Sequence, residues 1–194
     1  MQRAHIRAIA IALAVLAFLA ATACTHADIA WKEADNGELS GNGNAPTPLG
    51  IWGPGTHTVM ATSGSGDIDD FTFTIPAGLT LQSITNSAYS GLDETAFIGL
   101  APGNTINHAI APTGLIGYQH FGPAQGNTGT DLLQFMGGPQ GPGNYSIWWQ
   151  QASSFPSTVQ LDFVVTPEPA SALSLGLLAV AFTTTRRRVV RPKT

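Results

Sequence analysis

The sequence predicts an all-β protein: an antiparallel, jelly-roll-like β-sandwich of about eight strands. Three observations lead to this prediction. Short segments of alternating apolar and polar residues follow one another at close spacing. Glycine and proline separate these segments, and no helical apolar period is found outside the two ends of the chain. Many short strands joined by turn residues indicate two packed antiparallel sheets.

The expected strands share a pattern in which every second side chain is apolar. The clearest is 70–75, where two phenylalanines and an isoleucine lie on one face and two threonines on the other. The proline and glycine of 76–78 then predict a β-turn. Residues 28–55 are polar and rich in turn residues, and no helix is expected there. The expected strands are 57–62, 70–75, 79–86, 97–100, 115–120, 132–136, 145–151 and 158–165.

Residues 1–27 have the features of a secretory signal peptide. Two arginines precede an apolar run at 8–23, and small residues lead to Ala27, after which we expect cleavage. One alternative is lipoprotein processing at Cys24, although the usual leucine three residues earlier is missing. The other is an uncleaved anchor helix. Because Cys24 is the only cysteine, the exported domain would contain no disulfide.

Residues 167–194 form a three-part tail. Pro167-Glu168-Pro169 is followed by 16 uncharged residues at 170–185 and then by Arg186, Arg187 and Arg188. As a helix the uncharged run would be about 24 Å long, which is short for a free-standing membrane span. An arginine cluster after an apolar run favours the cytoplasmic side. The tail therefore predicts a transmembrane helix with the bulk of the protein outside.

This layout resembles the PEP-CTERM sorting signal of Gram-negative bacteria that make exopolysaccharide. The resemblance implies an exosortase as partner, with cleavage near the proline-glutamate-proline motif. It implies export by the secretion machinery, anchoring in the inner membrane before processing, and a final place at the cell surface or in the extracellular matrix. The alternative is an ordinary C-terminal anchor that happens to contain the motif.

The segment between the two end signals, 28–166, is expected to be one domain. It contains one basic residue, Lys32, and eleven acidic residues, which give a net charge of −10 with histidine neutral. Such a surface disfavours nucleic acid and anionic lipid. It is compatible with divalent cations or neutral sugars.

The stretch GDIDDFTFTIPAG at 66–78 resembles the corresponding segment of bacterial pre-peptidase C-terminal (PPC) domains. The acidic residues at 33–40 are similar to the lead-in of that family, and 143–148 is similar to its glycine-tyrosine strand. The resemblance covers most of 33–165. It implies a PPC-like β-sandwich that accompanies secreted enzymes as a non-catalytic module, and in some relatives a calcium ion between an N-terminal segment and a strand edge.

Acidic residues in two stretches form a calcium hypothesis, because calcium takes six to eight oxygen ligands. An alternative is that the aspartates are solvated and cap the turn before the strand at 70–75. Asn36 would assist as an amide ligand. The expected metal ligands are Glu33, Asp35, Glu38, Asp67, Asp69 and Asp70.

Aromatic residues near the end of the domain form a sugar-binding hypothesis. Trp148 and Trp149 are adjacent in a strand, so they point to opposite faces, and we expect one in the core and one exposed. An exposed ring suits the apolar face of a sugar, with Tyr145 as a third contact. Tyr118, Gln150 and Gln151 could assist. The alternative is a tryptophan half-buried at a sheet edge.

No catalytic constellation is present in the sequence. His57, His108 and His120 are far apart, and no nucleophile elbow, zinc-protease motif or P-loop occurs. We therefore expect a non-catalytic, structural or adhesive protein of the cell envelope or extracellular matrix, associated with exopolysaccharide. The alternatives are a calcium-stabilised carbohydrate-binding module and a secreted hydrolase.

Overall fold

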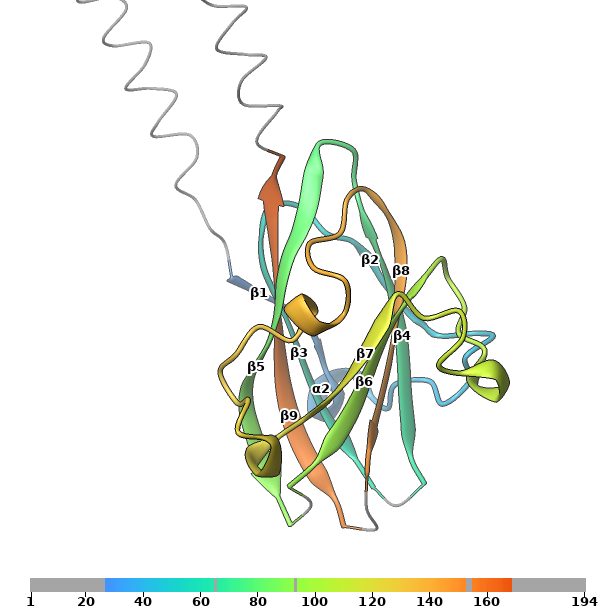
Figure 1. The fold of residues 1–194 in the computed structure, drawn as a ribbon, viewed down its shortest axis with the longest axis vertical. Helices are drawn as coiled ribbons and strands as arrows, with labels where there is room; N and C mark the ends of the chain where they lie inside the picture. Colours follow the sequence, from blue (N-terminus) through green and yellow to red (C-terminus); the bar gives the residue numbers. More distant parts are fainter. Residues whose placement is uncertain (1–26, 65, 93, 153–154, 169–194) are drawn as a thin grey trace, which may run out of the picture.

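Two β-sheets packed face to face make up the part of the chain that the structure, a computed structural model, describes: residues 27–64, 66–92, 94–152 and 155–168 (Figure 1). The all-β sandwich expected from the sequence is confirmed. The strands are β1 (Ala27–Lys32), β2 (Thr47–Ile51), β3 (Gly55–Ser63), β4 (Ile68–Ile75), β5 (Leu79–Gly91), β6 (Ala96–Pro102), β7 (Gly117–Phe121), β8 (Gly143–Gln151) and β9 (Ser157–Pro167). Helical turns are α2 (Glu33–Asn36), η1 (His108–Ile110), η2 (Pro123–Gln125) and η3 (Leu133–Phe135).

One sheet has the strand order β1-β3-β9-β5 and the other the order β2-β4-β8-β6-β7. All pairs among β3 to β9 are antiparallel, as predicted. The prediction is wrong for the two N-terminal strands, because β1 pairs with β3 and β2 with β4 in parallel. Parallel pairing needs a long crossover. Here the chain between β1 and β3 passes through α2 and β2, and the chain between β2 and β4 passes through β3 in the other sheet.

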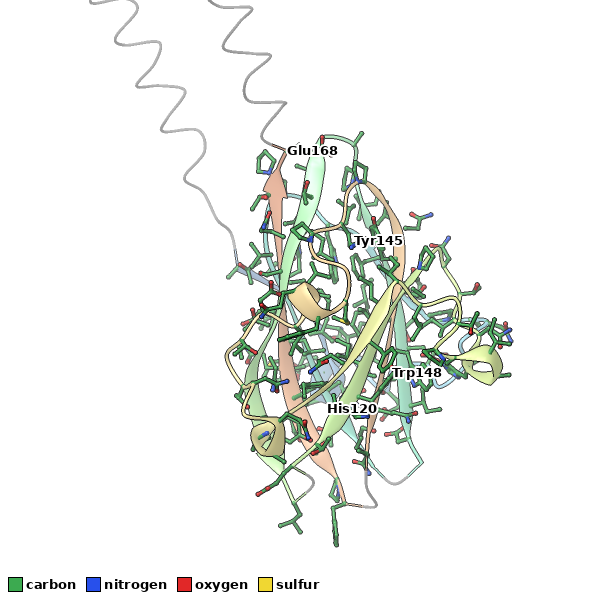
Figure 2. The ribbon with its side chains drawn as sticks, in the orientation of Figure 1. His120, Tyr145, Trp148 and Glu168 are labelled. Carbon is green, nitrogen blue, oxygen red and sulfur yellow. The ribbon has the colours of Figure 1, made fainter. Side chains whose placement is uncertain are left out.

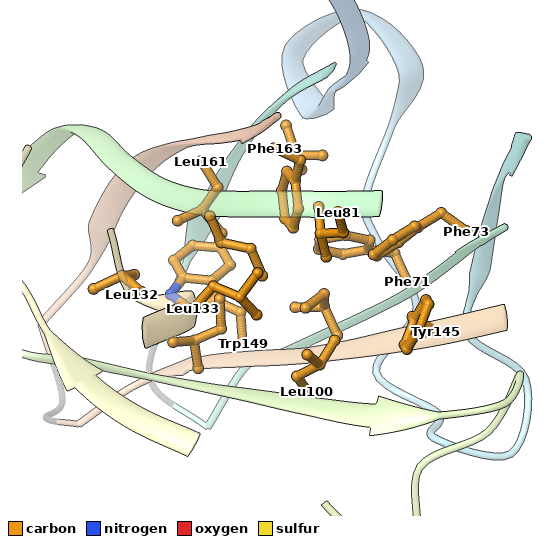
Figure 3. Close-up of a cluster of buried hydrophobic side chains, with 14 of the residues drawn as sticks. Phe71, Phe73, Leu81, Leu100, Leu132, Leu133, Tyr145, Trp149, Leu161 and Phe163 are labelled. Atoms are coloured by element: carbon orange, nitrogen blue, oxygen red, sulfur yellow. The ribbon is translucent and has the colours of Figure 1, made fainter. Parts of the chain in front are cut away.

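The core lies between the sheets and is built by strand alternation (Figure 3). Phe71 and Phe73 of β4 point inward and meet Phe163 of β9, with ring centroids 5.9 and 5.7 Å apart. Trp52, just after β2, stacks on Phe73 at 3.9 Å. Trp149 of β8 is buried beside this cluster. These rings pack between the two sheets, and their inward position determines which face of each strand is exposed.

Two sequence expectations about local structure are wrong. Residues 132–136 contain the helical turn η3 and not a strand, because Asp131 accepts hydrogen bonds from the Ile84 and Leu133 amides, at 3.0 Å each, and holds a tight turn. The lead-in at 28–55 contains two strands and the one-turn helix α2. Both strands lie at a sheet edge, where a strand pairs on one side only.

The last strand continues one residue beyond the expected domain boundary at 166. Pro167 ends β9 opposite Leu79, and the Glu168 amide donates to the Gly78 carbonyl at 2.9 Å. Figure 2 shows Glu168 where β9 ends. The rest of the predicted sorting motif (Pro169, Arg186, Arg187 and Arg188) and the signal peptide lie outside the described residues, apart from Ala27. Among the described residues, no helix has the length and apolarity to cross a membrane.

Candidate metal centre and aromatic sheet face

Three carboxylates from separate segments meet near the end of the sandwich at which β4 begins. Glu33 opens α2, Glu38 follows it, and Asp69 lies at the start of β4. One oxygen of each lies within 4.8 Å of the others. The chain reverses after α2 at Gly37, which has a φ of 91° and donates to the Glu33 carbonyl at 2.9 Å. This turn brings Glu38 back beside Glu33.

Glu33 joins α2 to the neighbouring strands. Its Oε2 accepts a hydrogen bond from the Thr62 amide of β3 at 2.6 Å, and its Oε1 accepts one from the Leu39 amide at 3.3 Å. Leu39 itself is buried in the core. The side chain is therefore held in one orientation before any ion binds.

Asp69 is the unusual member of the cluster. It pairs with Trp149 across the sheet and points inward like Phe71, two residues later. Its side chain is fully buried, and no amide or hydroxyl donor among the described residues reaches either carboxyl oxygen. The Glu33 carboxyl is close enough to share a proton with it. A buried carboxylate without donors is unfavourable unless it is protonated or binds a cation.

The pKa values of the cluster show how strongly it favours a positive partner. Burial, followed by the charges of Glu33, Asp67 and Glu38, raises the pKa of Asp69 from 3.8 to about 10. Burial also raises the pKa of Glu33 from 4.5 to about 7, although the hydrogen bonds from Thr62 and Leu39 act in the opposite direction. Without a cation, the cluster therefore retains protons at neutral pH. A bound cation would replace them.

The other predicted ligands lie elsewhere. Asp67 is close enough to raise the pKa of Asp69, and it accepts from the Gly64 amide at 3.2 Å, as a turn cap does. Asp35 is exposed and forms an ion pair with Lys32 at 3.0 Å, and it lies outside the group of three carboxylates. Asp70 lies outside this group as well, because strand alternation sends it to the opposite face of β4. Asn36 accepts from the Lys32 amide at 3.1 Å.

The expected sugar-binding residues divide between the two faces of β8. Trp149 is buried in the core, and Tyr145 is also buried, its hydroxyl donating to the Gly141 carbonyl at 2.8 Å. Both therefore belong to the core and not to an exposed face, and Trp149 is the tryptophan that the alternation places inside (Figure 3). Trp148 lies half-buried on the outer face, and its Nε1 donates to Gln150 at 3.1 Å (Figure 2).

Trp148 belongs to a row of rings that crosses the outer face of the five-stranded sheet. Its ring centroid lies 4.7 Å from that of Phe97 on β6, which lies 5.8 Å from that of Tyr118 on β7. On the other side it lies 4.6 Å from the ring of His108. His120 packs against Phe97 at 5.8 Å. We call these five residues the aromatic strip.

The contacts of Phe97 and the two histidines with this surface were not expected from the sequence. The sequence pattern did indicate part of this surface, because the outward positions of two expected strands hold Phe97, Tyr118 and His120. His108 lies outside any expected strand and is placed by its contact with Asp70. Its Nε2 lies 3.1 Å from the Asp70 carboxylate, which is fully buried. Burial raises the pKa of Asp70, and His108 opposes this shift.

Comparisons with known proteins find a likeness in fold only among solved structures. The scan against protein-family models finds no match, and the search of the curated proteins finds none either. Among solved structures, the chain is similar to the pre-peptidase C-terminal domain of a collagenase from Bacillus anthracis. The TM-score is 0.34 at 14% identity, over 62% of this chain and 93% of that chain. A likeness at this level says nothing about ligand or activity.

Proposed function

We propose that this chain is an exported, non-catalytic protein of the cell envelope or extracellular matrix, whose β-sandwich is stabilised by calcium and has a structural or adhesive role. The main support for a metal site is the environment of Asp69. Its two buried oxygens receive no hydrogen bond from an amide or hydroxyl among the described residues, and they lie beside the carboxyls of Glu33 and Glu38. A cation at this point would satisfy all three carboxylates together.

Calcium fits this group of ligands better than other common ions. The cluster offers only carboxylate oxygens, whereas zinc prefers nitrogen and sulfur ligands. Calcium accepts six to eight oxygens in irregular geometry, and magnesium requires a strict octahedron. Glu38 is exposed, so an ion and its remaining water ligands could enter from that side.

Thermal melting of the purified protein tests the metal. We expect calcium at millimolar concentration to raise the melting temperature relative to chelator, and magnesium to raise it much less. Calorimetric titration should then show one binding event that releases protons, because calcium displaces them from Asp69 and Glu33. A melting temperature that is the same in calcium and in chelator would exclude the site.

Export and sorting form a separate part of the proposal. They are supported by the signal-like residues 1–27 and by the PEP-CTERM-like tail at 167–194. An exosortase would be the processing partner. The intact mass of the protein recovered from the surface fraction of its own cells tests this. Loss of both ends is the expected result, and retention of the arginine cluster would indicate a simple membrane anchor.

Carbohydrate binding is the second candidate function, and the aromatic strip is the observation that favours it. Aromatic faces stack on the apolar faces of sugars. A protein retained by polysaccharide in this way would fit a place in the extracellular matrix. The alternative of a secreted hydrolase predicts turnover of a glycan or peptide panel, whereas the present proposal predicts none.

A further inference from the structure

A cleft of about 370 Å³ lies at one end of the aromatic strip, between residues 41–44 and residues 106–109. We call it the loop cleft. It is lined by Asn42, Asn44, Asn107, His108 and the backbone of glycine residues. His108 belongs both to this cleft and to the aromatic strip, so the two features form one continuous surface.

Two of the asparagines are held with their amide donors unused. The Asn42 side-chain oxygen accepts from the Asn44 amide at 3.1 Å, and the Asn107 side-chain oxygen accepts from the Ala109 amide at 3.1 Å. These bonds fix each carboxamide through its oxygen. Neither NH₂ group has a protein partner among the described residues. Each is therefore available to donate to a ligand oxygen.

The two loops meet through their backbones, which gives the cleft a fixed floor. The Ile106 amide donates to the Gly43 carbonyl at 2.7 Å. A Cβ atom at Gly43 would overlap the Ile106 carbonyl oxygen and lie 3.1 Å from the His108 ring. Only glycine permits this approach. The cleft is thus formed before a ligand arrives, which lowers the entropic cost of binding.

His108 is anchored on the other side. Its Nε2 bonds to the buried Asp70 carboxylate at 3.1 Å, and its ring packs on Trp148. From Trp148 the strip continues across β6 to Tyr118 on β7, whose side chain is 45% exposed. The strip thus extends over β8, β6 and β7, with neighbouring strands about 4.8 Å apart.

The outward side chains of β3 and β9, in the four-stranded sheet, differ from those of the aromatic strip. There the outward positions of β3 and β9 hold mainly threonine, glutamine and aspartate. Thr58 bonds to Asp162 at 2.7 Å, and Thr62 to Thr158 at 2.9 Å. These side chains satisfy one another, as expected for a solvated sheet face. Aromatic rings beside unused amide donors occur on the five-stranded sheet, at the loop cleft.

We propose that the loop cleft and the aromatic strip together bind a neutral polysaccharide. The carboxamides and His108 would hydrogen-bond to hydroxyl groups in the cleft. The exposed ring of Tyr118 and the accessible part of the half-buried Trp148 ring would stack on successive sugar units. A polyanion is disfavoured, because residues 28–166 carry a net charge of −10 and neither the cleft nor the strip contains lysine or arginine. The inference rests on the adhesive role proposed above and names its ligand class.

Native affinity electrophoresis suits an acidic protein and tests this directly. The purified protein would be run, with calcium present, in gels containing hydroxyethylcellulose, galactomannan or polygalacturonate. We expect at least one of the two neutral glycans to retard it and the polyuronate to have no effect. Retardation by polygalacturonate alone would overturn the inference, as would no retardation by either neutral glycan.

Matched variants locate the surface. Asn107→Asp keeps the oxygen that accepts from Ala109 but removes the NH₂ donor, and Trp148→Ala removes the central ring. Each should weaken retardation at least tenfold. The control is Asn144→Asp, the same change on the same sheet, where the side-chain oxygen accepts from Thr74 at 2.8 Å. It should bind as the wild type does. Equal retardation of wild type and Asn107→Asp would refute the assignment even if Trp148→Ala failed to fold.

The calcium and glycan proposals fail in different ways. If calcium leaves the melting temperature unchanged while Asn107→Asp still loses retardation, the metal proposal is wrong and the glycan surface stands. If calcium stabilises the protein and no neutral glycan retards it, the glycan surface is wrong and the metal site stands.

Discussion

Replacing Asp69 with asparagine should stabilise the calcium-free protein at neutral pH and abolish its response to calcium. The change keeps the shape of the side chain and removes its ability to ionise. In the calcium-free wild type the raised pKa keeps Asp69 protonated at pH 7, so folding at that pH costs the free energy of taking up a proton. An asparagine at 69 is neutral without taking up a proton, and it cannot serve as an ionised ligand.

The magnitude follows from the pKa of Asp69, raised from 3.8 to about 10. The folded state binds the proton of the Asp69 carboxyl more tightly than the unfolded state does. Protonated Asp69 therefore makes its full contribution to the free energy of unfolding below pH 3.8. This contribution is lost as pH rises toward 10, at about 1.4 kcal/mol per pH unit. At pH 7 the loss is therefore at most about 4 kcal/mol. A buried, unpaired carboxamide costs about 1–3 kcal/mol. The net gain for Asp69→Asn is about 2 kcal/mol.

The assay is thermal melting at pH 5 and pH 7.5, in chelator and in calcium. A gain of 2 kcal/mol corresponds to about 6 °C for a domain of this size. Without calcium, the wild type should melt lower at pH 7.5 than at pH 5, and Asp69→Asn should lose most of this difference. With calcium at 100 times its Kd, the wild type should gain about 2.7 kcal/mol, and the variant should gain nothing.

Asp35→Asn is the matched control. It makes the same chemical change two residues from Glu33, at an exposed carboxylate paired with Lys32. It should leave the pH dependence and the calcium response unchanged. The reasoning would be refuted if Asp69→Asn were less stable than the wild type in chelator at pH 7.5. It would also be refuted if the variant bound calcium with wild-type affinity.

Three further outcomes are expected. His108→Ala leaves the buried Asp70 carboxyl without its hydrogen-bond partner and should lower the free energy of unfolding in urea by about 1–3 kcal/mol. Adding Asp70→Asn should recover most of this loss, and no recovery would mean that the pair is not the cause. Trp149→Ala empties a fully buried site, so urea denaturation should show a loss of about 3–5 kcal/mol; a loss below 1 kcal/mol would contradict its place in the core. Since the Glu168 amide is bonded to Gly78, the sorted protein should end at or beyond Glu168, and a mass ending before it would argue against this.

The sequence was sufficient to predict those strands that bury one face in the core and expose the other. The alternation of 70–75 predicts β4, and Phe71 and Phe73 are indeed in the core. It was insufficient for β2, because Pro48 and Gly50 within five residues indicate a turn. An edge strand tolerates both, since it pairs on one side only. For 132–136 the apolar residues fit a strand or a helical turn, and the bonds to Asp131 decide between them.

The sequence also contained more about the proposed metal site than its acidic residues alone. Asp69 is two residues before Phe71, and therefore on the same inward face of the strand, whereas Asp70 shares the outward face of the threonines. This alternation separates the buried ligand from its neighbour. The contacts of Glu33 with Thr62 and of Asp70 with His108 join residues 29 and 38 positions apart. Local patterns cannot predict such pairings.

The two proposed sites share one segment of chain, residues 33–44. Glu33 and Glu38 face the metal centre. The carbonyl of Ser40 accepts from the Asp70 amide at 2.7 Å, and the chain then crosses the edge of β4 to line the loop cleft at 41–44. The Asp70 amide anchors this crossing, and Asp69, on the other face of β4, lies beside Glu33 and Glu38. A calcium ion held by the two glutamates would therefore also restrain the segment that forms one wall of the cleft, so loss of the ion should weaken glycan binding without any change in the aromatic strip.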